Sequence, residues 1–406
     1  MNNNQNEHIV VVLGMHRSGT STIARGLEAI KIELGDDLMK GASGNNEKGF
    51  FEDMDVFRLN NELLQEIGHD WHMLTPILPE ELLLPLSGGL KLRAVEVLRK
   101  KLNKTRLFGL KAPQMARLLP FWQAVFTHLN IHVSYIIACR NPMSVARSLS
   151  KRDGFNLEKG YYLWLEHMFS ILKNTDGQPR IVVDYDLLMD DPIRELQRMA
   201  KILAIPFNPD DPDVTEYRTN FLEESLRHSR YYLKDLKLDK SVPDCVFALH
   251  KLLLNLAKEI IHFNHHDAVS LLNRIDLQLR ENYPALHYMQ VCDQQLIDLK
   301  KSIGECNEQI NERNEQIVIL SQSVSEYNEH TNKLNHLLSE RDKQIDDLNK
   351  MLSERDEKIK CLMQEIKTIK CELDIIYNSK SWLFTKPLRS FRQLIKENQR
   401  PKKDNR

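Results

Sequence analysis

The stretch "VVVLGMHRSGTST", Val10 to Thr22, joins an apolar, β-branched run to a turn bounded by two glycines. A phosphate-binding loop normally reads G-x-x-x-x-G-K-[ST], with a lysine that reaches the phosphates. Gly14 and Gly19 keep that spacing, but Thr20 takes the lysine position and Arg17 is the only cation inside the loop. The turn therefore predicts an anion site with unusual side chains.

The wider pattern around this turn predicts an α/β fold. Short apolar runs recur as "HIVVVL", "LFGL", "HVSYIIA" and "RIVVDY", beginning at residues 8, 107, 132 and 180. Long segments with apolar residues three and four apart separate them, and the segment "SGTSTIARGLEAIKI" begins such a helix directly after the loop. This alternation is typical of a parallel sheet flanked by helices. The segment "VFALHKLLLNLAKEIIHF" predicts a further amphipathic helix over residues 246–263, packed on the sheet domain.

Composition bounds the possible partners and locations. The chain has 406 residues, a length typical of two or three domains, and a formal net charge of −1, so we expect no nucleic-acid partner. Its 6 cysteines are scattered without a CxxC pair, so we expect neither a metal site nor a disulfide framework. The polar start "MNNNQNEH" and the lack of a long apolar run predict a cytoplasmic protein.

The C-terminal part follows a seven-residue repeat. Apolar residues fall at intervals of seven from Leu296 to Leu373, and a second set follows three residues later, from Leu299 to Ile376. This pattern predicts a coiled coil about 120 Å long, hence a homo-oligomer, with a parallel dimer favoured. Arginine at three positions of the second set weakens the seam. The predicted divisions are a phosphate-loop domain over 1–235, a helical extension over 236–288, the coil over 289–377 and a basic, aromatic tail over 378–406.

A second motif follows the third apolar run. In "CRNPMSVARSLSKRDG", Arg140 ends the strand and Ser148 follows eight residues later on a predicted helix. This spacing allows a guanidinium and a hydroxyl to hold one anion, and Lys151 and Arg152 add positive charge. A helix-capping cluster with a solvated basic face would look the same.

The side chains of the two motifs bear on the chemistry. Phosphoryl transfer from a nucleoside triphosphate recruits Mg²⁺ and usually a lysine. A sulfuryl group carries a single negative charge, so fixed donors and one arginine can stabilise its transfer. Together the motifs resemble the sulfotransferase superfamily, whose donor is 3′-phosphoadenosine 5′-phosphosulfate (PAPS). "GMHRSGTST" is similar to its 5′-phosphosulfate loop and "RNPMSVARS" to its 3′-phosphate motif.

Other segments extend the resemblance over about half of the chain, from Ile9 to Pro206. "NNEKGFFEDMDVFRLNNELL", "LKAP" and "VVDYDLLMDDP" occur in the order seen in a bacterial branch of the superfamily. The resemblance implies an α/β fold related to nucleotide kinases, with PAPS across the carboxyl ends of the strands and no metal. It departs from the family pattern at Ala112 and Gln114, where many relatives have an acid and an arginine, and a Gly-rich basic motif is not visible.

The resemblance also implies roles for individual residues. Arg17 would contact the sulfuryl group and the bridging oxygen, and Lys111 would stabilise charge near the acceptor, although a solvated lysine at a strand end would look the same. The implied donor-binding residues are His16, Arg17, Ser18, Gly19, Thr20, Ser21, Arg140, Ser148 and Arg152.

Transfer to a hydroxyl or amine also needs a group that takes the acceptor's proton. Glu52 is our first choice, because it follows the loop helix at the distance where related enzymes place an acidic base. Asp53, Asp55, His69 and His72 are alternatives, and Glu52 could equally cap the next helix.

Two other functions compete with sulfuryl transfer. A kinase or NTPase is supported by "RIVVDYD", where Asp184 ends an apolar run as a magnesium-holding aspartate would. A coiled-coil scaffold with an inactive domain is the other. The basic, aromatic tail could lie on an anionic membrane surface or dock on a partner, and a solvated basic tail would have the same composition. Its segment "SWLFTKPLRSFR" resembles tails of bacterial cell-surface glycosyltransferases, which predicts a glycan or lipid-linked saccharide as acceptor, with a membrane or glycan-assembly contact. Small alcohols and proteins stay open as acceptors.

Overall fold

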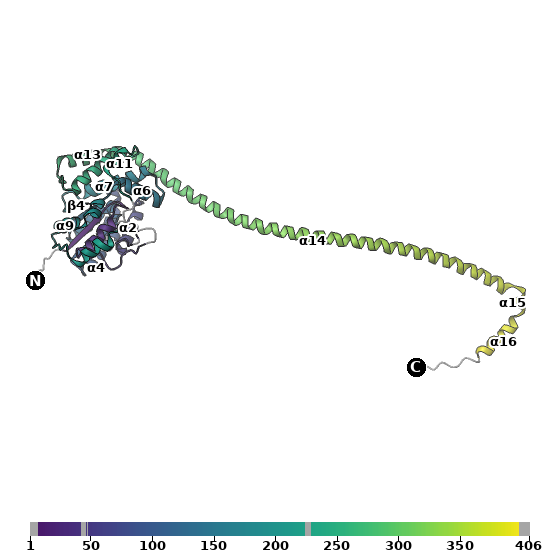
Figure 1. Cartoon of the computed structure of the whole chain (residues 1–406). Helices are drawn as coiled ribbons and strands as arrows, with labels where there is room; N and C mark the ends of the chain where they lie inside the picture. The colour runs from purple at the N-terminus through teal and green to yellow at the C-terminus, as the bar shows by residue number, and fades with distance from the viewer. Residues whose placement is uncertain (1–6, 42–45, 47, 224–228, 398–406) are drawn as a thin grey trace. The chain divides into compact units, whose positions relative to one another are not determined.

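The computed structural model describes residues 7–41, 46, 48–223 and 229–397. The chain divides into two compact units, Met1–Leu299 and Lys300–Arg406. The first unit contains the strands and most of the helices, and the second contains the rest of one long helix and two short helices (Figure 1). The candidate site belongs to the first unit.

A four-stranded parallel sheet forms the centre of the first unit. Its strands are β1 (His8–Leu13), β2 (Leu107–Lys111), β3 (His132–Cys139) and β4 (Arg180–Asp184), in the order β2-β1-β3-β4. These are the four apolar runs of the sequence, so the prediction of a parallel α/β sheet is confirmed. Their β-branched side chains suit a strand that is buried on both faces.

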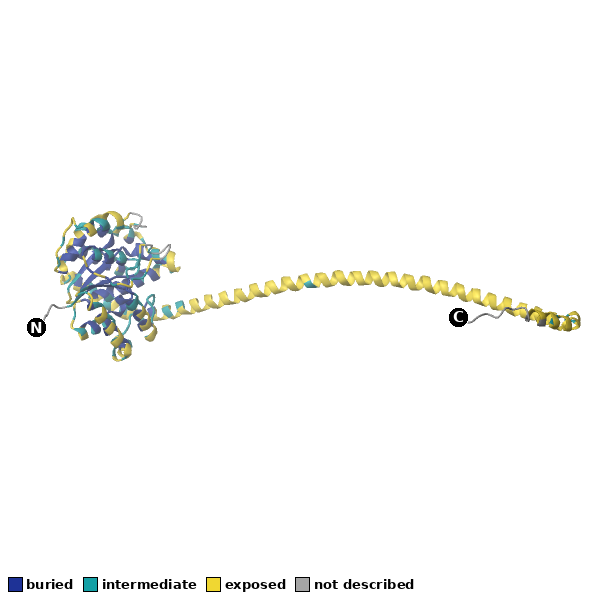
Figure 2. Ribbon diagram, turned by 90° about the horizontal axis from the view of Figure 1, so that it is seen from below, coloured by how far each residue is buried: buried dark blue, intermediate teal, exposed yellow. Residues whose placement is uncertain are grey.

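Alternate residues of β1 contribute to two separate hydrophobic cores. Ile9, Val11 and Leu13 belong to one core, and Val10 and Val12 belong to the core on the other face. Figure 2 shows the buried residues of this unit in dark blue. Helices α1 (Thr20–Ala29) and α9 (Pro192–Ile202) cover the second face. The first core is formed with α2 (Met54–Glu66), α4 (Gly89–Leu102), α5 (Met115–Leu129), α6 (Pro142–Asp153), α7 (Leu157–Asn174), α12 (Asp244–Ala257) and α13 (His266–Glu281).

Shorter elements connect these helices. They are η1 (Pro79–Leu82), α3 (Leu83–Ser87), α8 (Tyr185–Asp190), α10 (Pro212–Glu216), η2 (Tyr217–Phe221) and α11 (Leu233–Leu238). The helix predicted over 246–263 is shorter than expected, since α12 ends at Ala257. The reason is local: Glu259 adopts the left-handed conformation, with φ of 58°, which ends an α-helix.

The heptad region forms one helix, α14 (Tyr283–Asn378), followed by α15 (Lys380–Phe384) and α16 (Lys386–Glu397). The predicted coil boundary at residue 289 lies inside α14. Apolar side chains of the repeat are exposed along the single helix, for example Ile345 at 54% and Leu348 at 60%. The coiled-coil partner and the domain divisions stay predictions. Within the described parts of the chain, no helix is both long and apolar enough to cross a bilayer.

Candidate donor-binding site

The strand order places a crevice beside the glycine-bounded loop. β1 and β3 are neighbours, and the loops after them lead to helices on opposite faces of the sheet, α1 and α6. In open parallel sheets, ligands bind outside the carboxyl ends of strands at such a switch point. The two motifs found in the sequence therefore flank one crevice.

The loop after β1 is built around backbone geometry that needs glycine. Gly19 has a φ of 82°, and a Cβ atom there would lie 2.3 Å from Cδ2 of Tyr185. Arg17 also has a positive φ, 68°, a conformation that is uncommon outside glycine and often found at functional sites. Helix α1 begins at Thr20 without a side-chain cap, so its first N–H groups remain available to an anion.

A cavity of about 460 Å³ lies at this loop. Its wall includes most of the predicted donor-site and catalytic residues: His16, Arg17, Gly19, Thr20, Ser21, Glu52, Lys111, Arg140 and Arg152. Ser18 is fully buried beneath the loop, and Ser148 is linked to the cavity through Arg17. Residues that are far apart in the sequence thus surround one space.

Three arginines give this space a positive charge. Arg17 donates from Nε to Ser148 Oγ at 2.8 Å, and Arg140 donates to the Arg17 carbonyl oxygen at 3.3 Å. Burial lowers the pKa of Arg17, and the charges of Arg152 and Arg140 lower it further. Cations that repel one another in a cavity favour an anion between them.

The two halves of the predicted 3′-phosphate clamp differ in their contacts. Ser148 accepts from Arg17, whereas the Arg140 guanidinium lies over the ring of Tyr185 at 4.4 Å. Arg152 pairs with Asp153 at 2.9 Å and is the most solvent-exposed of the three arginines. The Arg17–Ser148 contact was not expected, because the two residues are 131 positions apart.

Glu52 and Lys111 form a buried ion pair in the wall. Lys111 Nζ lies 2.6 Å from Glu52 Oε1 and also donates to the Phe50 carbonyl oxygen at 3.0 Å. The two residues are 5% and 3% exposed. Burial lowers the pKa of Lys111, and the Glu52 carboxylate opposes this shift. Lys111 is therefore not a solvated lysine at a strand end.

The other carboxylates considered as bases have structural partners. Asp53, not Glu52, caps α2 by accepting from the backbone N–H groups of Asp55 and Val56. Asp53 also lies 2.5 Å from Lys101 Nζ, and Asp55 lies 3.2 Å from the same atom. Neither aspartate is among the described residues that line the cavity.

The two histidines considered as bases are engaged elsewhere. His69 Nε2 lies 2.9 Å from Glu81 Oε1, and His72 lies 3.5 Å from Asp70. Burial lowers the pKa of His72, which keeps its ring neutral. Neither histidine is found among the cavity-lining residues in the described part of the chain, so Glu52 is the predicted base with the best position.

His16 differs from the other loop residues. Its ring packs against Trp71 with centroids 4.4 Å apart. Burial lowers its pKa well below the usual value, and the charge of Arg152 acts in the same direction. The imidazole is therefore neutral at pH 7 and offers the cavity a hydrogen-bonding ring instead of a charge.

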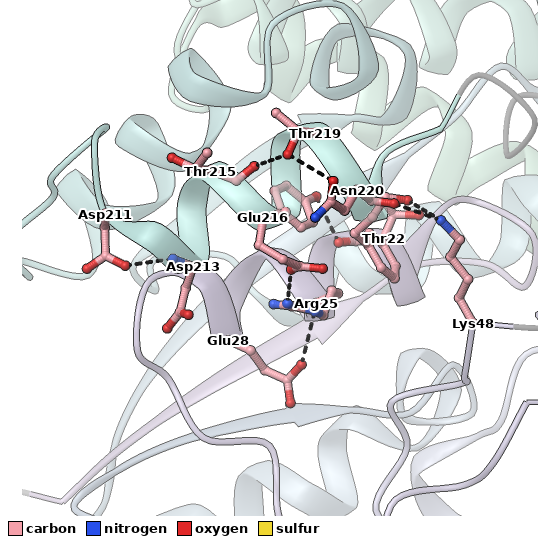
Figure 3. Close-up of polar contacts among 12 residues, drawn as sticks. Thr22, Arg25, Glu28, Lys48, Asp211, Asp213, Thr215, Glu216, Thr219 and Asn220 are labelled. Atoms are coloured by element: carbon pink, nitrogen blue, oxygen red, sulfur yellow. Dashed lines mark hydrogen bonds and ion pairs between the residues drawn. The ribbon is translucent and has the colours of Figure 1, made fainter.

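Another part of the cavity wall comes from Phe221, the last residue of η2, and from Asn46, Lys48, Gly49 and Phe50; Figure 3 shows the Lys48 side chain reaching towards η2. Lys48 Nζ donates to the Phe221 carbonyl oxygen at 2.7 Å and pairs with Glu223 at 2.6 Å. Arg25 of α1 pairs with Glu216, which ties the base of η2 to the loop helix. Aromatic rings of Tyr185 and Phe221 line the cavity and offer flat surfaces to a planar base.

The sequence does not predict this part of the cavity wall. Lys48 and Phe221 are 173 positions apart and carry no motif. The only local sign is the run of small and aromatic residues around "KGFF", which was assigned to the family segment without a binding role.

The first turns of α14 make polar contacts with the domain that holds the site. Gln290 Oε1 accepts from Thr75 Oγ1 at 2.6 Å and from the Thr75 N–H at 3.2 Å. Lys159 lies 2.7 Å from Asp293 and holds its ammonium over the ring of Phe155. These contacts lie within Met1–Leu299, so the first turns of α14 belong to the domain that holds the site.

The rival magnesium site is not supported by the position of Asp184. Its Oδ1 accepts from the N–H groups of Asp186 and Leu187, so the carboxyl caps α8. Burial raises the pKa of Asp184 to about 7, and the charge of Asp186 adds to the shift. No cluster of three or more metal-binding side chains occurs among the residues that the structure describes.

Comparisons with known proteins find similarity at the level of structure. No family model matches the chain, and no curated protein matches it significantly. The sulfotransferase domain of the Synechococcus olefin synthase is 17% identical, with a TM-score of 0.35 over 68% of this chain and 97% of that domain. A Mycobacterium tuberculosis sulfotransferase is 12% identical, with a TM-score of 0.33 over 63% of this chain and 77% of that one.

A further similar structure is retinol dehydratase in complex with androsterone and the inactive cofactor PAP. It is 13% identical, with a TM-score of 0.25 over 70% of this chain and 80% of that one. At such scores and identities the likeness carries no argument about activity, so the function is argued from the site.

Proposed function

We propose that the protein is a sulfotransferase that moves a sulfuryl group from PAPS to a hydroxyl or amine of an acceptor. The observation that carries this proposal is the convergence of Arg17, Arg140 and Arg152 on a phosphate-type loop that lacks the usual lysine. The N-terminus of α1 adds backbone donors to the same place. The donor has two separated anionic groups, which suits guanidinium groups from two different loops.

The residues of the cavity can be assigned to parts of this donor. PAPS supplies an activated sulfuryl group whose leaving group is a nucleotide phosphate. Ser21, Thr20 and the α1 N-terminus would hold the 5′ end, and Arg17 would stabilise the charge that develops on the bridging oxygen. Arg140 would hold the 3′-phosphate, while Tyr185 offers its ring to the base or the ribose.

Glu52 and Lys111 supply the acceptor side of the proposed reaction. The Glu52 carboxylate takes the proton of the acceptor hydroxyl as its oxygen bonds to sulfur. Lys111 Nζ holds this carboxylate at 2.6 Å, and after the transfer its positive charge balances that of the sulfate. Because both groups are buried, their interaction is stronger than it would be in water.

The acceptor and location are the finer part of the proposal. We take a cell-surface glycan or lipid-linked saccharide as the acceptor and the cytoplasmic face of the membrane as the place, with the coil as a homodimer. The glycosyltransferase-like tail sequence and the heptad repeat support this choice. Polar side chains in the cavity wall, Asn46 and Gln114 among them, suit a hydroxyl-rich acceptor.

The test uses the whole chain and two labelled donors. PAPS labelled with ³⁵S and ATP labelled at the γ-phosphate with Mg²⁺ are each incubated with bacterial polysaccharides and with lipid-linked saccharides. We expect ³⁵S transfer that Arg17→Ala abolishes, and transfer of the ATP label would replace the proposal with the kinase alternative. No transfer from PAPS, together with no binding of its product, would favour the scaffold.

A further inference from the structure

The tail that follows the long helix has an unusual exposed surface. Among the described side chains of α15 and α16, Leu383 is 55% exposed, and four other large apolar side chains lie in solvent: Phe384 is 87% exposed, Leu388 74%, Phe391 70% and Ile395 51%. Single exposed apolar side chains are common on proteins, but a contiguous group of them marks a surface that binds a partner or a membrane. We call these four residues the apolar stripe.

The spacing of the stripe places it on one side of α16. At about 100° per residue, Leu388, Phe391 and Ile395 fall within about 60° of one another around the helix axis. Phe384 continues the stripe four residues before Leu388, from the end of α15. A helix with such a one-sided apolar face and a charged flank lies flat at an interface.

Cations flank the stripe. Residues 380–397 contain five lysines and arginines and one acid, Glu397. On α16, Arg389, Arg392 and Lys396 lie next to the stripe, between about 40° and 100° from Leu388. Cations in that position meet the headgroups when the apolar face enters the acyl boundary.

The turn between α15 and α16 is held by one arginine. The Arg389 guanidinium lies 3.3 Å from the centre of the Trp382 ring and donates to the Trp382 carbonyl oxygen at 2.6 Å. A second donation goes to Thr385 Oγ1 at 2.8 Å. The two short helices therefore have a defined local arrangement before any partner binds, which lowers the ordering cost of binding.

From these contacts we infer that the tail, residues 380–397, is a docking surface for an anionic lipid bilayer. The occupant is a membrane because the apolar side chains form a narrow stripe beside clustered cations. A groove on a protein would need acidic side chains placed opposite these cations, and no feature of the tail calls for such a fixed arrangement. The inference deepens the proposed membrane location by naming the docking surface and the charge of the lipid, and it is independent of the sulfuryl-transfer reaction. A dimeric coil would present two tails and strengthen binding to one surface.

The test is sedimentation of the full-length protein with lipid vesicles. Vesicles of phosphatidylcholine alone are compared with vesicles containing phosphatidylserine or phosphatidylglycerol. We expect binding to the anionic vesicles that weakens as salt rises. Changing Arg392→Gln and Lys396→Gln together should weaken binding to the anionic vesicles roughly 25-fold, because each cation strengthens binding roughly fivefold.

Matched variants separate the tail from general effects of charge and apolarity. Lys343→Gln with Lys350→Gln removes the same charge from the exposed rod, and Val318→Ser removes an exposed apolar side chain outside the heptad seam. Both should bind as the parent does, whereas Phe391→Ser should lose most binding. Circular dichroism should show the same helix content in every variant.

Two results would overturn the inference. One is equal sedimentation with anionic and uncharged vesicles, since the cations would then have no role. The other is the absence of vesicle binding by a helical, correctly assembled parent protein, which would leave a protein partner as the occupant of the stripe. Neither result depends on whether the protein transfers sulfuryl groups.

Discussion

Replacing Glu52 by glutamine removes the carboxylate half of the buried ion pair and keeps the shape of the side chain. At 2.6 Å and an effective dielectric constant of about 20, the Coulomb attraction between the two charges is about 6 kcal/mol. Desolvation of both groups offsets much of this gain. Removing one partner leaves Lys111 charged and 3% exposed, with two neutral acceptors, Phe50 O and Ser21 Oγ. These acceptors and the new amide oxygen of the E52Q side chain still accept hydrogen bonds from Lys111. We therefore expect the free energy of unfolding to fall by about 3 kcal/mol, the low end for a broken buried ion pair.

The pH dependence of this loss identifies its cause. Lys111 has its pKa lowered from the ordinary value of 10.5 by burial, and Glu52 opposes that shift, so E52Q lowers the pKa further. Between the two pKa values of Lys111, the unfolded chain therefore keeps a proton that the folded variant has released. The difference in free energy of unfolding between the parent and E52Q is therefore largest at pH 7, and it becomes smaller as the pH rises towards 10.5.

The assay is thermal unfolding of the full-length protein, followed by the fluorescence of its tryptophans at pH 7 and pH 10. For a unit of the size of Met1–Leu299, a loss of about 3 kcal/mol corresponds to a melting temperature lower by roughly 5 °C. The control is Lys111→Met, which removes the other half of the ion pair. The variant that carries both changes should lose about 2 kcal/mol less stability than the two single losses added together. Additive losses, or an E52Q deficit that does not change with pH, would refute the ion pair as the cause.

Three further predictions concern other parts of the chain. Gly19→Ala should lower stability by about 2 kcal/mol and abolish nucleotide binding, because its Cβ would overlap the Tyr185 ring; a rise in the variant's melting temperature when nucleotide is added would contradict this. Gln290→Ala should lower the stability of the site domain by about 1 to 3 kcal/mol, because the buried Thr75 loses the acceptor of its hydroxyl and its N–H; an unchanged melting temperature would contradict this. Ile345→Asp should shift sedimentation towards the monomer, whereas a monomeric parent would be unaffected.

The fold was predictable because its signals are local. Four apolar runs, three of them rich in β-branched residues, mark the four strands, and the glycine-bounded turn marks the passage from β1 to α1. In each case burial on both faces of the sheet requires a continuous apolar run, which is visible without any knowledge of tertiary contacts. The helix after Pro243 was predicted too long, because nothing in its composition shows that Glu259 is left-handed.

The site was predictable only in part. The loop and the Arg140 motif were found because their residues are close in sequence. The pairing of Glu52 with Lys111 joins residues 59 positions apart, and the contact of Arg17 with Ser148 joins residues 131 apart. Such pairings depend on which strands are neighbours in the sheet, and the sequence shows strands without their order.

The boundary of the site domain illustrates the same limit. A change of pattern near residue 289 marks the start of the heptads, but α14 already begins at Tyr283. Its first turns remain attached to the domain through Gln290 and Asp293. A fragment that ends at residue 288 would lack both contacts, so experiments on the site should use the whole chain.

The most direct test of the central claim is ligand-dependent melting of the full-length protein. Adenosine 3′,5′-bisphosphate, its 2′,5′ isomer and ATP with Mg²⁺ are each added to the parent and to Arg140→Ala. At a hundred times its dissociation constant a ligand stabilises the folded state by about 2.7 kcal/mol, a shift that melting resolves. The account predicts a shift with the 3′,5′ compound that is lost in Arg140→Ala. A shift with Mg²⁺ and ATP alone would contradict it.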